Sequence, residues 1–172
     1  MSFAAIAWVD VFELACSLRA RAGLLAKPGE WRIVNLRGPK AEADPEDDAA
    51  FVRFKAATQW PELSNVLSQL QRLGVERTGG PVEFGRQYLE MLAPGAVVPW
   101  ERAEGGYAER FSRVHLALRT NPAATTFIGG AAANMQPGVV NLIDRRVPYS
   151  AINLGTSWRC HLVVDFRQKE QE

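Results

Sequence analysis

The first half of the chain, residues 1–80, has mainly helical patterns of apolar and polar residues. Apolar residues recur over 4–26 at an approximately helical spacing, which predicts an amphipathic helix. A second helix is predicted after Pro61, with Gly74 at its end. Between the two helices, residues 31–36 (WRIVNL) predict a short strand. This half is therefore expected to form a helical support layer with one short strand.

From residue 82 onward the pattern changes to short apolar segments separated by turns. The turns contain Pro94-Gly95, Asn121-Pro122 and Gln136-Pro137-Gly138. The expected strands are 82–93, 96–100, 113–120, 124–130, 133–135, 139–143, 149–153 and 158–166. Seven or eight strands at spacings of roughly eight to twelve residues are typical of an all-β sandwich or barrel. We expect one domain over residues 1–172, with its β core at 82–166 and a charged tail at 167–172.

Composition and charge exclude some classes of protein. The formal net charge is +1, so no nucleic-acid-binding surface is evident, and no apolar run approaches the ~20 residues that span a bilayer. Asp10 and Glu13 interrupt the apolar N-terminus, which therefore resembles an amphipathic helix more than a signal peptide. We expect a cytoplasmic protein, or part of a larger intracellular or viral assembly, that is not secreted.

Two other compositional features have ordinary structural explanations. Residues 38–50 are acidic and contain proline, which predicts an exposed, solvated loop. Cys16 and Cys160 lie far apart in apolar surroundings, so we expect buried free thiols in a reducing compartment.

Both histidines occur in the same small pattern, Arg-x-His. The first pair is Arg113 and His115, and the second is Arg159 and His161. Side chains two apart on a strand share a face, so each pair places a cation and an imidazole on one side and apolar residues on the other. Two such strands suggest a pocket for an anion.

Between residues 88 and 166 the chain contains, in one collinear order, the segments LAPGAVVPW, RVHLAL, NMQPGVVNLID and YSAINLGTSWRCHLVVDF. Together these segments resemble the aspartyl/asparaginyl β-hydroxylase family. Members of this family are iron(II)- and 2-oxoglutarate-dependent oxygenases. The resemblance implies a mainly β fold with flanking helices, a double-stranded β-helix (jelly-roll, cupin-like) barrel.

The same resemblance implies that the metal ligands are lost. The family's two histidine positions correspond to Trp100 and Tyr149, and its acidic position to Arg102. An indole N–H has no lone pair to offer, arginine repels a cation, and a phenol with a pKa near 10 is a costly ligand. We therefore expect no metal, with the two aromatic side chains facing each other across the former site and filling it.

The family's oxoglutarate-binding positions are retained. Arg159 matches the arginine that pairs with the distal carboxylate of 2-oxoglutarate, and His115 matches the histidine at its other carboxylate. Arg113 corresponds to an arginine that faces substrate, and His161 shares a face with Arg159. The four residues are thus candidates for binding a 2-oxoglutarate-like anion. Internal pairing of the arginines is the alternative, and Asp144, Asp165 and Glu90 are the candidate partners.

Three functions stay open at this point. The leading hypothesis is a non-catalytic member of the family, used for binding or as a structural or assembly subunit. The first alternative is an active hydroxylase of an amino-acid or peptide side chain, with iron(II) in a site rewired around Glu101, Glu104, Asp144 or His115. The second is a metal-free protein that binds a small carboxylate such as 2-oxoglutarate.

The partners expected are correspondingly few. A small carboxylate, a protein partner or a second copy of the chain fit the hypotheses, whereas no nucleic acid or membrane is indicated. The glycine-rich loop at 104–106, Gly129-Gly130 and Arg145-Arg146 are expected to be exposed candidates for contact.

Overall fold

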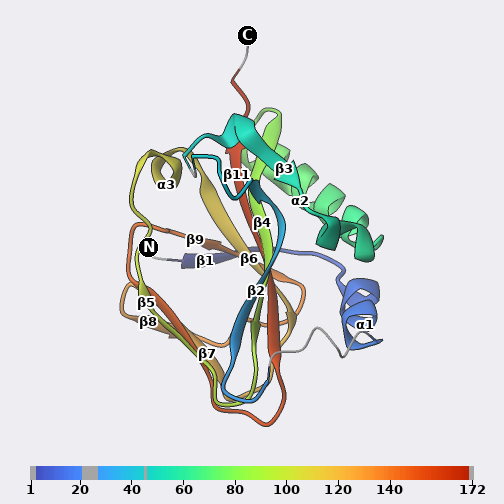
Figure 1. Cartoon of the computed structure of the whole chain (residues 1–172), viewed down its shortest axis with the longest axis vertical. Coiled ribbons are helices and arrows are strands. Elements are labelled where there is room, and N and C mark those ends of the chain that lie inside the picture. The colour runs from blue at the N-terminus through green and yellow to red at the C-terminus, as the bar shows by residue number, and fades with distance from the viewer. Residues whose placement is uncertain (1–2, 21–26, 45, 171–172) are drawn as a thin grey trace.

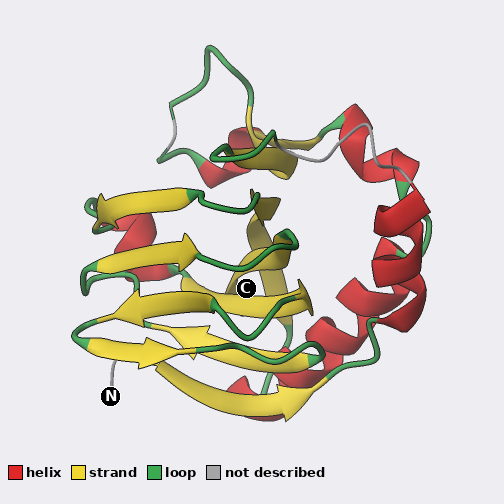
Figure 2. Ribbon diagram, turned by 90° about the horizontal axis from the view of Figure 1, so that it is seen from below, coloured by secondary structure: helices red, strands yellow, loops and turns green. Residues whose placement is uncertain are grey.

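The protein is built from two antiparallel sheets that face each other, with helices packed on the outside of the larger one (Figures 1 and 2). The structure is a computed structural model that describes residues 3–20, 27–44 and 46–170. The larger sheet has seven strands in the order β1-β9-β6-β11-β4-β2-β3, and the smaller has four in the order β5-β10-β7-β8.

The strands are β1 (Phe3–Trp8), β2 (Trp31–Pro39), β3 (Phe51–Arg53), β4 (Val82–Leu92), β5 (Val97–Glu101), β6 (Ser112–Arg119), β7 (Ala124–Ile128), β8 (Ala131–Ala133), β9 (Val139–Ile143), β10 (Tyr149–Asn153) and β11 (Arg159–Gln168). The helices are α1 (Phe12–Ala20), α2 (Leu63–Thr78) and α3 (Gly106–Arg110), with 3₁₀ turns η2 (Asp48–Ala50) and η3 (Lys55–Gln59). The eight strands expected after residue 82 correspond to β4–β11, so the jelly-roll class is confirmed. The two sheets do not close into a barrel.

Strand β11 lies at the centre of the larger sheet, with the apolar core on one of its faces and buried polar side chains on the other. It pairs with β4 on one side and with β6 on the other. Cys160, Leu162 and Val164 pack into the core that α1 and α2 complete, because they alternate with Arg159 and His161 along the strand. The predicted separation of apolar and polar faces on this strand is thus confirmed.

The N-terminal half contributes more to the sheet than its sequence pattern indicates. Residues 3–8, expected to be helical, form β1 and pair with β9. The remainder of the expected helix is α1, while residues 21–26 lie outside the described residues. β2 is longer than expected and lies between β4 and β3. The unpaired edges of β9 and β4 offer backbone hydrogen bonds that a local helical pattern does not register.

Helix α2 continues past the glycine that was expected to end it. Gly74 is buried inside the helix, where an added Cβ would lie 2.8 Å from a Cγ of Val82. The helix ends at Thr78, and Gly79 provides the left-handed cap with φ of 73°. Gly74 is therefore required by close packing against β4, and the prediction that it terminates the helix was wrong.

Other local expectations had mixed outcomes. Cys160 is buried and free, and burial raises the pKa of its thiol to about 12, whereas Cys16 is free but exposed. β11 extends through Gln168, into the segment expected to be a tail. In the acidic loop, Glu46 accepts a hydrogen bond from the backbone N–H of Tyr107, so part of this loop is anchored. No described helix is long and apolar enough to cross a membrane.

We expect Leu162→Ala to lower the free energy of unfolding by about 2–5 kcal/mol, because it leaves a cavity at the centre of the core. Leu154→Ala is the matched control, since Leu154 is 70% exposed and its loss should change stability by less than about 0.5 kcal/mol. Urea denaturation of both variants measures the difference. Similar losses in the two variants would contradict this placement of the core.

Candidate functional site

The structure contains a cleft of about 470 Å³. Its wall is formed by side chains from β2, β4, β5, β6, β9 and β10, from the loop between β9 and β10, and from residues 54, 102 and 103. The charged and aromatic residues among them are Arg37, Phe54, Arg86, Tyr88, Glu101, Arg102, Arg113, His115, Arg145 and Tyr149. The cleft is therefore mainly basic and aromatic.

A buried ion pair lies between the two sheets. Nη1 of Arg159 donates to Oε2 of Glu90 at 2.6 Å, and both side chains are almost fully buried. The hydroxyl of Tyr149 contacts the two oxygens of the same carboxylate at 3.1 and 2.8 Å. Arg159 also donates to the Thr126 hydroxyl at 3.2 Å. Burial raises the pKa of Tyr149, and the neighbouring Glu90 charge raises it further, so the phenol is protonated and donates its hydrogen bond.

The two histidines are buried and neutral. Burial lowers the pKa of His115 and of His161 well below the ordinary value, and the cation of Arg159 lowers both further. Nη2 of Arg159 lies 2.9 Å from Nδ1 of His161. Arginine can only donate, so Nδ1 is the acceptor and Nε2 of the neutral ring carries the proton. Within the described part of the chain, this Nε2 and Nδ1 of His115 are buried without a hydrogen-bond partner.

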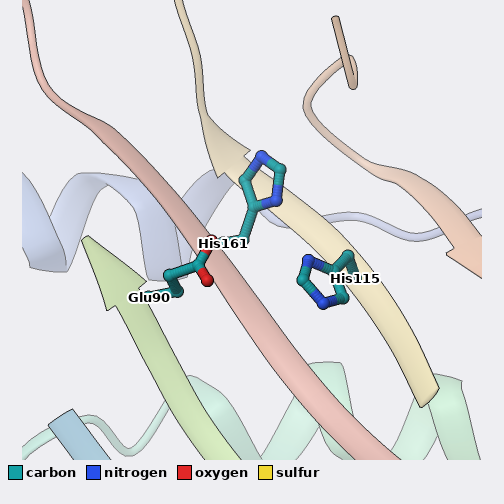
Figure 3. Close-up of side chains that lie close together, drawn as sticks. All are labelled: Glu90, His115 and His161. Carbon is teal, nitrogen blue, oxygen red and sulfur yellow. The ribbon is translucent and has the colours of Figure 1, made fainter. Parts of the chain in front are cut away.

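Glu90, His115 and His161 form a cluster on the neighbouring strands β4, β6 and β11 (Figure 3). One ligand atom from each lies within 4.8 Å of the others. Two imidazoles and a carboxylate are the donor types that non-haem iron(II) uses. Here, however, the Glu90 carboxylate is bound by the permanently charged Arg159, and Nδ1 of His161 accepts from the same guanidinium. The donor types suit a metal but their arrangement does not, since a cation placed there would meet Arg159 at close range.

A second buried cluster centres on Asp165, which is fully buried on β11. Arg113 donates to its two oxygens at 2.7 and 3.0 Å. Arg145 approaches the same carboxylate at 3.5 Å with its Nη1 atom. Two cations thus share one anion. Burial lowers the pKa of Arg145 and the adjacent Arg113 charge lowers it further.

The structure brings the four predicted anion-binding residues into one interior region but supplies two of them with internal partners. Arg159 is paired with Glu90 and Arg113 with Asp165, so the alternative of internal pairing is confirmed for both. Binding of a 2-oxoglutarate-like anion by Arg113, His115, Arg159 and His161 stays a prediction. Asp144, the third candidate partner, pairs instead with Arg146, which is exposed.

We expected Trp100 and Tyr149 to face each other and fill the former metal site, and this prediction is wrong for Trp100. The pairing of β5 with β10 is irregular, so that Glu101 lies opposite Tyr149 while Val98 lies opposite Ala151. This bulge turns Trp100 outward, where it is 61% exposed and its ring centroid lies 6.0 Å from that of Phe127. Only Tyr149 points inward, and it binds Glu90 rather than filling an empty cavity.

The other metal-related residues are dispersed. Arg102 is exposed and pairs with Glu104 at 3.0 Å. Glu101 lines the cleft, where burial raises the pKa of its carboxyl and the nearby Glu90 charge adds to this effect. Of the residues named for a rewired site, only His115 belongs to the observed cluster.

Sequence reasoning missed the association of Glu90 with His161. The two residues are directly opposite each other in the β4–β11 register. Glu90 is the one charged residue in the apolar segment 88–92 (YLEML) at the end of β4, and such an isolated charge is a signal that a buried partner exists. The partner itself depends on which strands pair, and spacing along the chain does not show this.

The fold and its interior define a class, the jelly-roll proteins with the architecture of 2-oxoglutarate- and iron(II)-dependent oxygenases. The chain belongs to the aspartyl/asparaginyl β-hydroxylase family, whose model matches residues 19–169. No curated protein matches the chain in sequence.

Solved structures show the same fold at low sequence identity. AviO1 from Streptomyces viridochromogenes Tue57 is 18% identical, with a TM-score of 0.63 over 99% of this chain and 91% of that one. A viral collagen prolyl hydroxylase from Paramecium bursaria Chlorella virus-1, solved with 2-oxoglutarate, is 9% identical, with a TM-score of 0.61 over 98% and 97%. A 2-oxoglutarate–iron(II) oxygenase family member from Burkholderia pseudomallei is 12% identical, with a TM-score of 0.60 over 90% and 78%.

The buried histidines should make folding sensitive to acid. Because their folded-state pKa values lie below the unfolded value of about 6.5, the unfolded chain binds more protons below that pH and stability falls as pH falls. From about pH 7.5 to about pH 5.5 each histidine should lower the free energy of unfolding by on the order of 1 kcal/mol. Denaturant titrations of the wild type and of His161→Gln measure this, and the histidine-dependent loss should be halved in the variant. An identical pH dependence in both proteins would contradict the assignment of a buried neutral His161.

Asp165→Asn should destabilise the protein by about 3–5 kcal/mol, because Arg113 and Arg145 would then share no buried counter-charge. Asp144→Asn removes the same charge from a pair whose arginine is exposed, so it should have a much smaller effect. Thermal and urea denaturation of the two variants make the comparison. Equal destabilisation would show that the Asp165 cluster has no special energetic role.

Proposed function

We propose that this protein is a non-catalytic member of the aspartyl/asparaginyl β-hydroxylase family that binds a ligand or partner without a metal. The observation that carries the proposal is the pairing of Glu90 with Arg159 and Tyr149 in the interior of the oxygenase fold. This carboxylate already has its charge compensated and its oxygens hydrogen-bonded.

The charges around the cluster support a metal-free site. Arg159 is held in place by Glu90, Thr126 and His161 together, so it cannot leave without exposing several buried polar groups to an apolar environment. Its positive charge occupies the region in which a divalent cation would need negative ligands. His161 presents a protonated Nε2, which has no lone pair for a metal.

A binding role is consistent with the parts of the fold that are retained. The cleft is about 470 Å³, within the usual range for sites that bind small molecules or peptide side chains. Much of its wall is sheet, and Arg37, Arg86 and Arg113 lie on β2, β4 and β6, whereas Arg145 lies in the loop between β9 and β10. A jelly-roll framework is readily reused in this way, since fold alone does not determine function.

Metal analysis with a turnover assay tests the proposal. Protein reconstituted anaerobically with Fe²⁺ and desalted should contain no stoichiometric iron, and 2-oxoglutarate should not be decarboxylated above the level of free Fe²⁺. The measurements are elemental analysis and release of CO₂ or succinate. Stoichiometric iron together with iron-dependent succinate release would overturn the proposal.

The cluster of Glu90, His115 and His161 favours one second candidate, an active 2-oxoglutarate-dependent hydroxylase with a rearranged metal site. In that case the three side chains would hold the iron, which supplies O₂ activation when bound, and Arg159 would have to release Glu90. His115→Ala should then abolish both iron binding and succinate release, while Glu104→Gln, at an exposed position, should leave them unchanged. Retention of iron in His115→Ala would exclude this candidate site.

A further inference from the structure

Arginines outnumber acidic residues in the lining of the cleft. Five arginines line it, and Glu101 is the one acidic residue among the described lining residues. The arginines are Arg37, Arg86, Arg102, Arg113 and Arg145. Arg102 pairs with Glu104, and Asp165 binds Arg113 through both of its oxygens. The excess of positive charge is therefore best defined where Arg113 and Arg145 share the one carboxylate of Asp165.

Arg145 is the residue at which the imbalance is greatest. Its side chain is only 6% exposed, although the sequence pattern suggested an exposed position. Within the described residues, its Nε and Nη1 atoms make no hydrogen bond, and its closest anionic contact is Asp165 at 3.5 Å. The guanidinium also lies over the ring of Tyr107, 5.0 Å from the centroid. A buried cation with unused donors is costly unless an anion approaches it.

The buried cluster around Arg159, in contrast, has no such surplus of positive charge. Arg159 is matched by Glu90, and its donors also reach Thr126 and His161. An incoming anion would have to compete there with a buried carboxylate 2.6 Å from the guanidinium. At Arg145 it would instead supply a counter-charge that is missing.

We propose that the cleft binds a small organic anion whose carboxylate or phosphate group pairs with Arg145 beside the Arg113–Asp165 pair. This inference rests on the proposed function, because it names what the metal-free cleft binds. The apolar part of such a ligand has Tyr88, Phe54 and Ile33 to pack against in the same cleft. A planar guanidinium with several N–H donors suits both carboxylate and phosphate oxygens.

Isothermal titration of the full-length, chelator-treated protein tests the proposal. The probes are succinate, 2-oxoglutarate and inorganic phosphate, with succinamide as the uncharged analogue. At least one anion should bind with a stoichiometry of one, its affinity should fall as salt is raised, and succinamide should not bind. The comparison of succinate with phosphate shows which oxyanion is preferred. Failure of all three anions to bind the wild type would overturn the proposal.

Variants locate the bound anion. Arg145→Gln should weaken binding by about tenfold or more, which corresponds to about 1.4 kcal/mol. Arg146→Gln is the matched control, because it removes the same charge from the adjacent, exposed residue and should leave affinity within about twofold. Equal weakening in the two variants would show only a diffuse charge effect and would overturn the assignment.

Two further measurements remove ambiguity from the result. Arg145→Lys keeps the positive charge, so it should bind the anion more tightly than Arg145→Gln does. Thermal denaturation of each unliganded variant shows whether a loss of binding is caused by misfolding. Binding by a correctly folded Arg145→Lys that is no tighter than binding by Arg145→Gln would contradict a role for the positive charge at this position. Unchanged binding in a folded Arg145→Gln contradicts the proposal. Iron content is measured on separate samples that are reconstituted with Fe²⁺ after the chelator is removed. Stoichiometric iron in those samples would count against the proposed function, whereas the anion titrations test the assignment of Arg145 itself.

Discussion

The buried ion pair between Glu90 and Arg159 is the interaction on which the arrangement of the interior depends. It lies on the inner face of the larger sheet, and hydrogen bonds from Tyr149 and to Thr126 connect it to β10 and β7 of the smaller sheet. Neither charge is tolerable alone away from water, so the pair constrains the register of β4 with β11 and the spacing of the two sheets. The contact that joins the layers is thus also the contact that occupies the carboxylate of the candidate metal cluster.

The same contacts support the proposal that the fold is used without a metal. An open metal site must keep donors unsatisfied until the ion binds, and its stability then depends on the ion. Here the Glu90 carboxylate is hydrogen-bonded by Arg159 and Tyr149 within the protein itself. Membership of the family and likeness to solved structures describe the framework, while the polar contacts inside that framework determine what it can bind.

The two buried clusters differ in charge balance, and the proposed binding role rests on this difference. Around Arg159 both terminal nitrogens of the guanidinium donate to acceptors within the protein. Around Asp165 two arginines share one carboxylate, and the excess positive charge lies against the cleft. Since both clusters are attached to β11, one strand carries the core on its outer face and both sites on its inner face.

The succession of strands after residue 82, the shared face of each Arg-x-His pair and the family could be predicted from the sequence, because strand alternation and turn residues are local signals. The tertiary structure alone makes a strand of residues 3–8, turns Trp100 outward through a bulge and buries Arg145. It also selected Glu90 as the partner of Arg159. These features depend on which strands pair and in what register, and contacts between residues far apart along the chain leave no periodic signal within it.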